Sequence, residues 1–266
     1  MKQMEANRRR WDELAERHLH STSYPIEAVI SGLSTLRPIE LEAFGDVTGK
    51  RLLHLQCHIG LDSISWARRG AEVVGIDFSA ASIKAAKALA HDCGVEVEFV
   101  QGDVMDLECC LEGGFDRVAA TYGVACWIPD LLKYFANAAA QLKPEGKFLV
   151  IDDHPFTEVL DQDTGTISDQ LSYFQEGPVN HCDERSYAQG TDQLSNRDNW
   201  QWPHRMEEFL NASSASFEDI ALREYPFSHY RKMRTLSLAE DGYWHSERNR
   251  MPLLMSVLAN DPISIR

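Results

Sequence analysis

The stretch that decides the fold is RLLHLQCHIGLDSISWARRGAEVVGIDF, from Arg51 to Phe78. Its pattern predicts a buried strand, a tight turn at Gly60, a helix, and a second strand that ends in Asp77. In open parallel sheets, ligands bind beyond the carboxyl ends of the strands, and an acid about 20 positions after the turn accepts hydrogen bonds from a ribose. The stretch therefore predicts half of a nucleoside-binding site.

The glycine content of the turn bears on which nucleoside is bound. A dinucleotide fingerprint needs three glycines at GxGxxG spacing, so that the backbone can approach a pyrophosphate. The turn QCHIGLDS contains only Gly60. A second unit of strand plus acid follows in VEVEFVQGDVMDL and contains Asp103. These features disfavour a nicotinamide-dependent oxidoreductase, which we keep as an alternative.

Together with FDRVAATYGVACWIPDL and KPEGKFLVIDDHPF, these motifs resemble those of the class I S-adenosylmethionine-dependent methyltransferases. The wording HLQCHxGxD and GVxCWxPDL, followed by a YF-rich insertion, is similar to a small-molecule branch of that family, from about Trp11 to the end of the chain. The family's first motif runs acid-x-Gly-x-Gly-x-Gly. Here His54 stands for the acid, Gln56 and His58 stand for two glycines, and Gly60 remains.

The resemblance implies a cofactor, S-adenosylmethionine, with S-adenosylhomocysteine as its product. It places the ribose at Asp77, the adenine at Asp103 beside the backbone of Val104, and the methionine part along the turn 56–60. The residues that it implies as cofactor contacts are Gln56, Cys57, His58, Gly60, Asp77, Phe78, Asp103, Val104 and Tyr122.

Strand and helix signals alternate from Leu52 to about Asp153, which predicts a right-handed, mostly parallel α/β sheet. Helices are expected over residues 61–69, 80–92 and 130–142, with a short turn near residue 105. Asp130 is the expected cap of the third helix. Further helices are expected ahead of the sheet, within residues 7–45, and over 204–212. The resemblance implies a Rossmann-like sheet of seven strands with helices on both faces, completed by a reversed hairpin from the runs 217–227 and 253–259.

We expect a single domain over residues 1–266, because a chain of this length can bury one full core. Its expected parts are an N-terminal helical lid (1–48), a cofactor-binding core (49–155), a substrate-cap insertion after the fifth strand (156–203), and a last helix with a C-terminal β-hairpin (204–266). The lid could equally be a helix that only packs on the flank of the sheet. The insertion is long and rich in aromatics, which favours a binding loop over disorder.

Charge and composition limit the kinds of partner that the protein can bind. The net charge of −15 makes nucleic acid an unsuitable partner, since neutralising phosphates needs clustered Lys and Arg. The six cysteines show no CxxC spacing, the N-terminus lacks the apolar run of a secretory signal, and no segment has the roughly 20 apolar residues of a membrane span. We therefore expect a cytoplasmic protein with reduced thiols, no membrane partner and no metal. The sequence leaves the oligomeric state open.

Methyl transfer from a sulfonium is an in-line displacement that needs alignment, exclusion of water and, for some acceptors, a base. An imidazole suits the last task because its pKa lies near neutrality. His154, after the fifth strand, and His204, before the next helix, are the candidate bases. The expected substrate contacts are Trp127, Tyr173, His181 and Trp202.

The sequence thus predicts an enzyme that transfers a methyl group from S-adenosylmethionine to nitrogen or oxygen of a small organic molecule, such as a secondary metabolite. A second alternative is a protein that binds the nucleoside cofactor without catalysis. The substitutions at Gln56 and His58 are the best argument for it.

Overall fold

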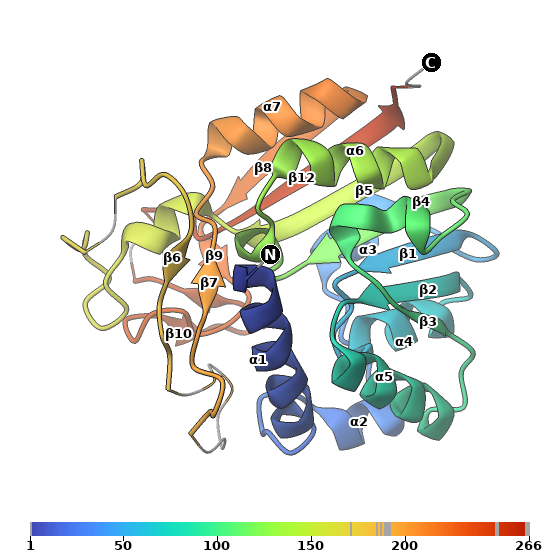
Figure 1. Ribbon diagram of the computed structural model, residues 1–266, viewed down its shortest axis with the longest axis horizontal. Coiled ribbons are helices and arrows are strands. Elements are labelled where there is room, and N and C mark those ends of the chain that lie inside the picture. The colour runs from blue at the N-terminus through green and yellow to red at the C-terminus, as the bar shows by residue number, and fades with distance from the viewer. Residues whose placement is uncertain are drawn as a thin grey trace.

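The apolar runs of the sequence form the central sheet of the computed structural model, which describes residues 2–170, 172–184, 186, 188, 193–247 and 250–263. Its strands are β1 (Arg51–Leu55), β2 (Glu72–Asp77), β3 (Glu98–Gln101), β4 (Phe115–Thr121), β5 (Leu142–Asp153), β8 (Phe217–Tyr225) and β12 (Leu254–Pro262). The strand order is β3-β2-β1-β4-β5-β12-β8 (Figure 1). The pairs among β1 to β5 are parallel, and β12 is antiparallel to both β5 and β8. The expected mostly parallel sheet of seven strands with a reversed terminal hairpin is confirmed.

The helices that cover the sheet begin at caps that the sequence provides. They are α4 (Leu61–Arg68), α5 (Ala80–Asp92), α6 (Leu131–Gln141) and α7 (Met206–Ser216). Asp130 caps α6 by accepting the amide of Lys133 at 3.0 Å, as expected, and Ser79 caps α5, which the sequence analysis did not name. The expected start of α7 at residue 204 is two residues too early, because Arg205 and Glu208 form a capping box there.

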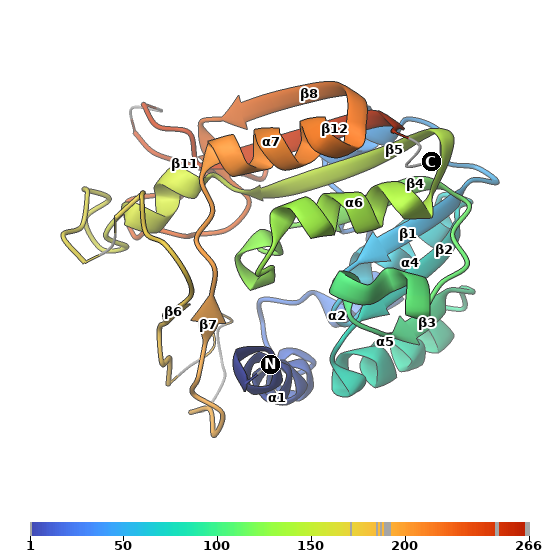
Figure 2. The same cartoon turned by 45° about the horizontal axis from the view of Figure 1, so that its top comes forward.

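The two faces of the sheet carry different helices. Helices α6 and α7 lie side by side on one face (Figure 2), over a core that includes Tyr134, Phe148 and Phe217. Helices α4 and α5 pack on the other face, with α2 (Ile26–Ile30) and α3 (Pro38–Phe44) beside them. The expected layers on both faces are therefore confirmed.

The carboxyl edge of the sheet is covered by segments from outside it. Helix α1 (Lys2–His18) lies along this edge beside α5, and the insertion runs next to it (Figure 1). The insertion contains a two-stranded sheet of β6 (Val179–Asn180) and β7 (Trp200–Gln201). Three 3-10 helices, η1 (Val104–Cys109), η2 (Ala125–Trp127) and η3 (Pro155–Val159), follow strands β3, β4 and β5.

A small sheet between β8 and β12 was not predicted. It consists of β9 (Phe227–Ser228), β10 (Ser237–Leu238) and β11 (Trp244–His245), in the order β10-β11-β9. Two-residue strands are too short to show an alternating pattern, so the sequence carries no periodic signal for them. Within the described ranges, none of the helices combines the length and the apolar character needed to cross a membrane.

Candidate active site

The turn after β1 keeps an unusual backbone although it has lost glycines. Gln56, His58 and Gly60 all adopt a positive φ, of 51°, 49° and 82°. A Cβ on Gly60 would lie 2.7 Å from Cζ of Phe99, so a side chain there would collide with the sheet as well as strain the backbone. The left-handed conformation at Gln56 and His58 costs of order 1–2 kcal/mol at each residue. Side-chain contacts offset this cost.

Those contacts fix the turn in place. Gln56 donates to the carbonyl of Val124 at 2.9 Å and accepts from the Tyr134 hydroxyl at 2.9 Å. The imidazole of His58 bonds Ser82 Oγ at 3.1 Å and the ring of His18 at 2.8 Å. Cys57, the residue between Gln56 and His58, is buried. The turn is therefore tied to the loop after β4, to α5 and to α1.

Asp77 ends β2 directly beside this turn. Its carboxylate accepts the amides of His58 and Ser79, both at 2.9 Å. Burial raises the pKa of Asp77 to about 6, although the two hydrogen bonds on their own lower it. Phe78 follows it, half-buried, with its carbonyl accepting from Gln101 Nε2 at 3.3 Å. A buried carboxylate at the carboxyl end of the second strand fits a ribose, whose hydroxyls can donate to its remaining lone pairs.

Asp103 lies at the next strand end, where β3 gives way to η1. It accepts the amide of Met105 at 2.9 Å and is exposed, while Val104 is buried beneath it. The third predicted position, Tyr122, follows β4 with a φ of 64°, and its hydroxyl donates to Glu40 Oε2 at 2.8 Å. The cofactor positions proposed from the sequence thus lie in order along one edge of the sheet.

Tyr122 belongs to a buried cluster that the sequence did not reveal. Burial, with the nearby charge of Asp62, raises the pKa of Glu40 to about 8. The Arg37 guanidinium lies 5.7 Å from the centre of the Tyr122 ring, and the ring of His229 lies 4.6 Å from it. The side chain of Tyr122 is therefore directed to α3 and the β9 strand end, and it orders the loop after β4.

Helix α1 closes over the turn and over the start of α5. Asp12 accepts from Ser79 Oγ at 2.7 Å and from the amide of Ala81 at 3.2 Å. Trp11 stands edge-on between the rings of His58 and Trp127, at centroid distances of 5.2 Å and 5.3 Å. Burial lowers the pKa of His18 to about 4, so the His18–His58 pair is neutral at pH 7.

The same helix holds the insertion. Asn7 exchanges two hydrogen bonds with the backbone of Trp200, and Arg10 donates to the carbonyls of residues 183, 196 and 197. Glu13 accepts the amides of Ser195 and Asn196, both at 2.9 Å. Although burial raises it, these amides and Arg17 together lower the pKa of Glu13 to about 2. Helix α1 and the insertion therefore form one layer over the edge, which supports the predicted lid position.

A small, partly open cavity of about 70 Å³ lies beyond the carboxyl ends of β4 and β5. The loop after β4, the end of β5, the insertion and the start of α7 surround it. Its lining residues are Gly123, Ala125, Cys126, Asp152, Asp153, Pro155, Glu158, Ser172, Gln175, Val179, His181, Gln201, Trp202, Pro203, His204 and Phe209. Three of the predicted residues, His181, Trp202 and His204, are brought together here.

The other predicted acceptor-side residues lie elsewhere. Trp127 donates from its indole to the carbonyl of Gly123 at 2.8 Å and faces Trp11 of α1. The Tyr173 hydroxyl accepts the amide of Met206 at 3.0 Å, which fixes the start of α7. Neither side chain lines the cavity.

The two candidate bases differ in what their ring nitrogens do. His154 is buried; Nδ1 accepts the amide of Phe156 at 3.1 Å, and Nε2 contacts Glu224 at 2.8 Å. Both nitrogens are therefore occupied, and the ring is not on the cavity wall. His204 lines the cavity, and its Nε2 must donate to the carbonyl of Ile128, 2.8 Å away, because a carbonyl only accepts. Its Nδ1 keeps a lone pair, and burial lowers its pKa.

The acidic wall of the cavity was missed by sequence reasoning. Asp152 accepts the amides of residues 123, 124, 125 and 153 at 2.7–3.0 Å, and so fixes the loop after β4. Asp153 and Glu158 both contact Lys232 Nζ, at 2.8 Å and 2.6 Å. The pair Asp152–Asp153 at a strand end was a signal for this wall. Lys232 follows β9 and stood in no motif.

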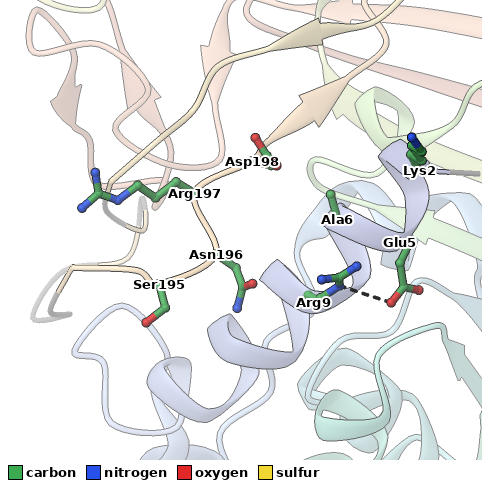
Figure 3. A pocket seen from close by; sticks show the side chains of 8 residues that line it. All are labelled: Lys2, Glu5, Ala6, Arg9, Ser195, Asn196, Arg197 and Asp198. Carbon is green, nitrogen blue, oxygen red and sulfur yellow. Dashed lines mark hydrogen bonds and ion pairs between the residues drawn. The ribbon is translucent and has the colours of Figure 1, made fainter.

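A larger, open cleft of about 750 Å³ lies on the outer side of α1 (Figure 3). It is lined by Lys2, Glu5, Ala6 and Arg9 of α1 and by residues 195–198 of the insertion. Glu5 bonds Arg9 at 3.3 Å, and Arg197 bonds Glu184 at 2.9 Å. This cleft lies away from the carboxyl ends of the strands of the central sheet, so the smaller cavity is the better candidate for the acceptor site.

In sequence, the chain resembles a known family over the segment that runs from β1 to the start of β5. Residues 52–146 match the model of a methyltransferase domain family. Over 121 residues, the chain is 33% identical to a ubiquinone biosynthesis O-methyltransferase of Xanthomonas euvesicatoria pv. vesicatoria (strain 85-10), covering 44% of this chain and 50% of that protein. The counterpart of Alkalilimnicola ehrlichii is 34% identical over 118 residues, covering 43% and 47%. The chain thus spans about half the length of these curated relatives.

Solved structures show the same fold at low identity. An S-adenosylmethionine-dependent methyltransferase from Mesorhizobium loti superposes with a TM-score of 0.59 at 20% identity, covering 87% of this chain and 99% of that one. One from Clostridium acetobutylicum ATCC 824 gives 0.54 at 12% identity, covering 84% and 88%. At these identities the likeness concerns the fold.

The sheet and its helices have the fold of solved S-adenosylmethionine-dependent methyltransferases, and residues 52–146 match a methyltransferase domain family. More particularly, the part that matches the methyltransferase domain family runs from β1 to the start of β5 and includes the turn, Asp77, Asp103 and the loop after β4. Those solved methyltransferases depend on S-adenosylmethionine, a molecule that carries an electrophilic methyl group on a sulfonium. The contacts of individual residues with it stay predictions.

Proposed function

We propose that the protein transfers a methyl group from S-adenosylmethionine to a nitrogen or oxygen atom of a small organic molecule. The observation that carries the proposal is the small, partly open cavity beyond β4 and β5, which the loop after β4 separates from the predicted cofactor positions. Asp77 would hold the ribose, Asp103 the adenine, and the turn 56–60 the methionine part. The acceptor would enter beneath the insertion.

The layer that α1 and the insertion form over the edge of the sheet would help to keep water away from a methyl transfer. Displacement at a methyl carbon needs the nucleophile aligned behind the S–C bond and water kept out. Where the acceptor carries a proton, His204 is the base that the geometry favours, because one ring nitrogen is held as a donor and the other can accept. His154 has no nitrogen left for that task.

Calorimetric titration with S-adenosylhomocysteine tests the cofactor assignment, with NAD as the control ligand. We expect micromolar binding of S-adenosylhomocysteine and none of NAD, since the turn lacks the glycines that admit a pyrophosphate. Release of S-adenosylhomocysteine from S-adenosylmethionine in the presence of acceptors then tests catalysis. A folded sample that binds NAD instead would contradict the proposal. Tight binding without turnover on a broad acceptor panel would favour a non-catalytic binding protein.

A further inference from the structure

The charges on the wall of the cavity are unequal. Three carboxyl side chains line it, those of Asp152, Asp153 and Glu158, and within the part of the chain that the structure describes no lysine or arginine does. Asp152 is saturated by four backbone amides, and burial raises its pKa to about 6. Asp153 and Glu158 are therefore the carboxylates left to act on a guest.

Lys232 contacts both Asp153 and Glu158 but does not itself line the cavity, and its single positive charge can neutralise only one of these two carboxylates. Its side chain is 9% exposed, and its ammonium contacts Asp153 and Glu158. Although burial lowers it, these two carboxylates together raise the pKa of Lys232 well above its usual value. Asp153, Glu158 and Lys232 together carry a net charge of −1, and Asp152 adds a further negative charge above its pKa of about 6.

Glu158 presents this excess charge to the cavity. Its Oε1 takes the contact with Lys232, and its side chain is 35% exposed, against 14% for Asp153. Among the described residues, Oε2 of Glu158 has no hydrogen-bond partner. Trp202 and Phe209 line the same cavity, and aromatic faces attract cations. Carboxylate and aromatic groups together select a positively charged nitrogen and repel a carboxylate or a phosphate.

We propose that the acceptor is a small organic amine, bound as an ammonium ion against Glu158 and methylated on nitrogen. The proposal rests on the proposed function and deepens it. The small volume of the cavity suits the amino end of a molecule.

The reaction balances with the groups present. The bound ammonium gives one proton to His204, and the lone pair of the resulting amine attacks the methyl carbon. The S–C electron pair stays on sulfur, so the products are a protonated N-methylamine and neutral S-adenosylhomocysteine. The positive charge that leaves the sulfonium reappears on the acceptor nitrogen, where Glu158 stabilises it. An oxygen acceptor would become an anion as it gave its proton to His204, and the carboxylates of the same wall disfavour that charge.

Ligand-observed NMR on the complex with S-adenosylhomocysteine tests the charge preference with two matched series. The probes are propylamine, propanol and propionate, and benzylamine, benzyl alcohol and benzoate, all at pH 7.5. We expect an amine to bind at least about tenfold more tightly than its alcohol or acid. Glu158→Gln should abolish that preference and Glu158→Lys should reverse it. Glu176→Gln, an exposed carboxylate of the insertion that does not line the cavity, is the matched control.

The product test uses tyramine, which offers an amine and a phenol in one molecule. Incubation with S-adenosylmethionine should yield the N-methyl product, located by fragmentation in mass spectrometry. The proposal is overturned if no amine binds, if the acids or alcohols bind equally well, if Glu158→Gln leaves the preference unchanged, or if methyl appears on the phenolic oxygen. S-adenosylhomocysteine that fails to bind would instead remove the proposed function itself.

Discussion

The carboxyl edge of the sheet has two sides that are built differently. The cofactor side, beyond β1, β2 and β3, comes from continuous stretches of strand, turn and helix, each closed by an acid such as Asp77 or Asp103. The acceptor side, beyond β4 and β5, is assembled from the β4 loop, η3, the insertion, the start of α7 and Lys232. Local motifs can encode the first side, whereas the second exists only after distant segments have packed together.

The largest expected effect breaks the acceptor side. Asp152→Ala leaves four backbone amides of the β4 loop and β5 without their acceptor, so we expect a loss of about 3 kcal/mol in the free energy of unfolding. Urea denaturation measures it. The control is Asp161→Ala, a half-buried carboxylate in a surface turn that also accepts backbone amides, for which we expect less than about 1 kcal/mol. Equal losses would show that the loop does not depend on the buried carboxylate.

A smaller effect separates the two acids of the cofactor side. Asp77→Ala should weaken binding of S-adenosylhomocysteine about 30-fold, because two ribose hydroxyls lose a charged acceptor. Asp103→Ala should weaken it only about threefold to tenfold, since that exposed side chain would offer one hydrogen bond to adenine. Calorimetry gives both constants, and thermal unfolding checks that each variant is folded. A larger loss for Asp103→Ala would reverse the assignment.

The pH dependence of binding sharpens the role of Asp77. Burial raises its pKa from 3.8 to about 6, so the folded protein takes up a proton where the unfolded chain is already ionised. The contribution of Asp77 to stability is thus fully present below pH 3.8 and is lost as the pH rises through 6. Cofactor binding should have the opposite sign, because in the proposed site the ionised carboxylate would accept both ribose hydroxyls.

From pH 7.5 to 5.5, affinity for S-adenosylhomocysteine should fall about fourfold, as the ionised fraction of a group with a pKa near 6 falls by that factor. His18, with a pKa of about 4, stays neutral over this range. Calorimetry at both pH values measures the change. Asp77→Asn should show a flat profile, and a slope that persists in this variant would point to another group.

The smallest expected effect on cofactor binding concerns the layer that joins the two sides. Glu13→Gln removes the charge that accepts the amides of Ser195 and Asn196, so amide hydrogen exchange in residues 193–201 should quicken about tenfold. Cofactor affinity should change by no more than about threefold, because Asp12 and His18 still hold α1. Glu16→Gln, an exposed side chain of the same helix, is the control. If the exchange rates of residues 193–201 did not change, Glu13 would not be what holds the insertion to α1.

The directions of side chains in the site could not be predicted from the sequence. His154 was a candidate base because it follows a strand end, yet the sequence could not show that Glu224 and the amide of Phe156 occupy both of its ring nitrogens. Trp127 and Tyr173 were placed by proximity in the chain, and their rings face α1 and α7 instead. Side-chain direction depends on partners that are far away in the sequence, and no local pattern records them.

The sequence by itself determined the parallel strands from β1 to β5, the helix that Asp130 caps, and the edge of the sheet on which the predicted cofactor positions lie. These follow from periodicity and local capping, which act over a few residues. Only the tertiary structure decided the left-handed turn without its glycines, the layer of α1 and the insertion, and the acidic cavity backed by Lys232. Each of these depends on contacts between segments up to about 190 residues apart, such as Asn7 with Trp200, and such contacts are set by the packing of the whole chain.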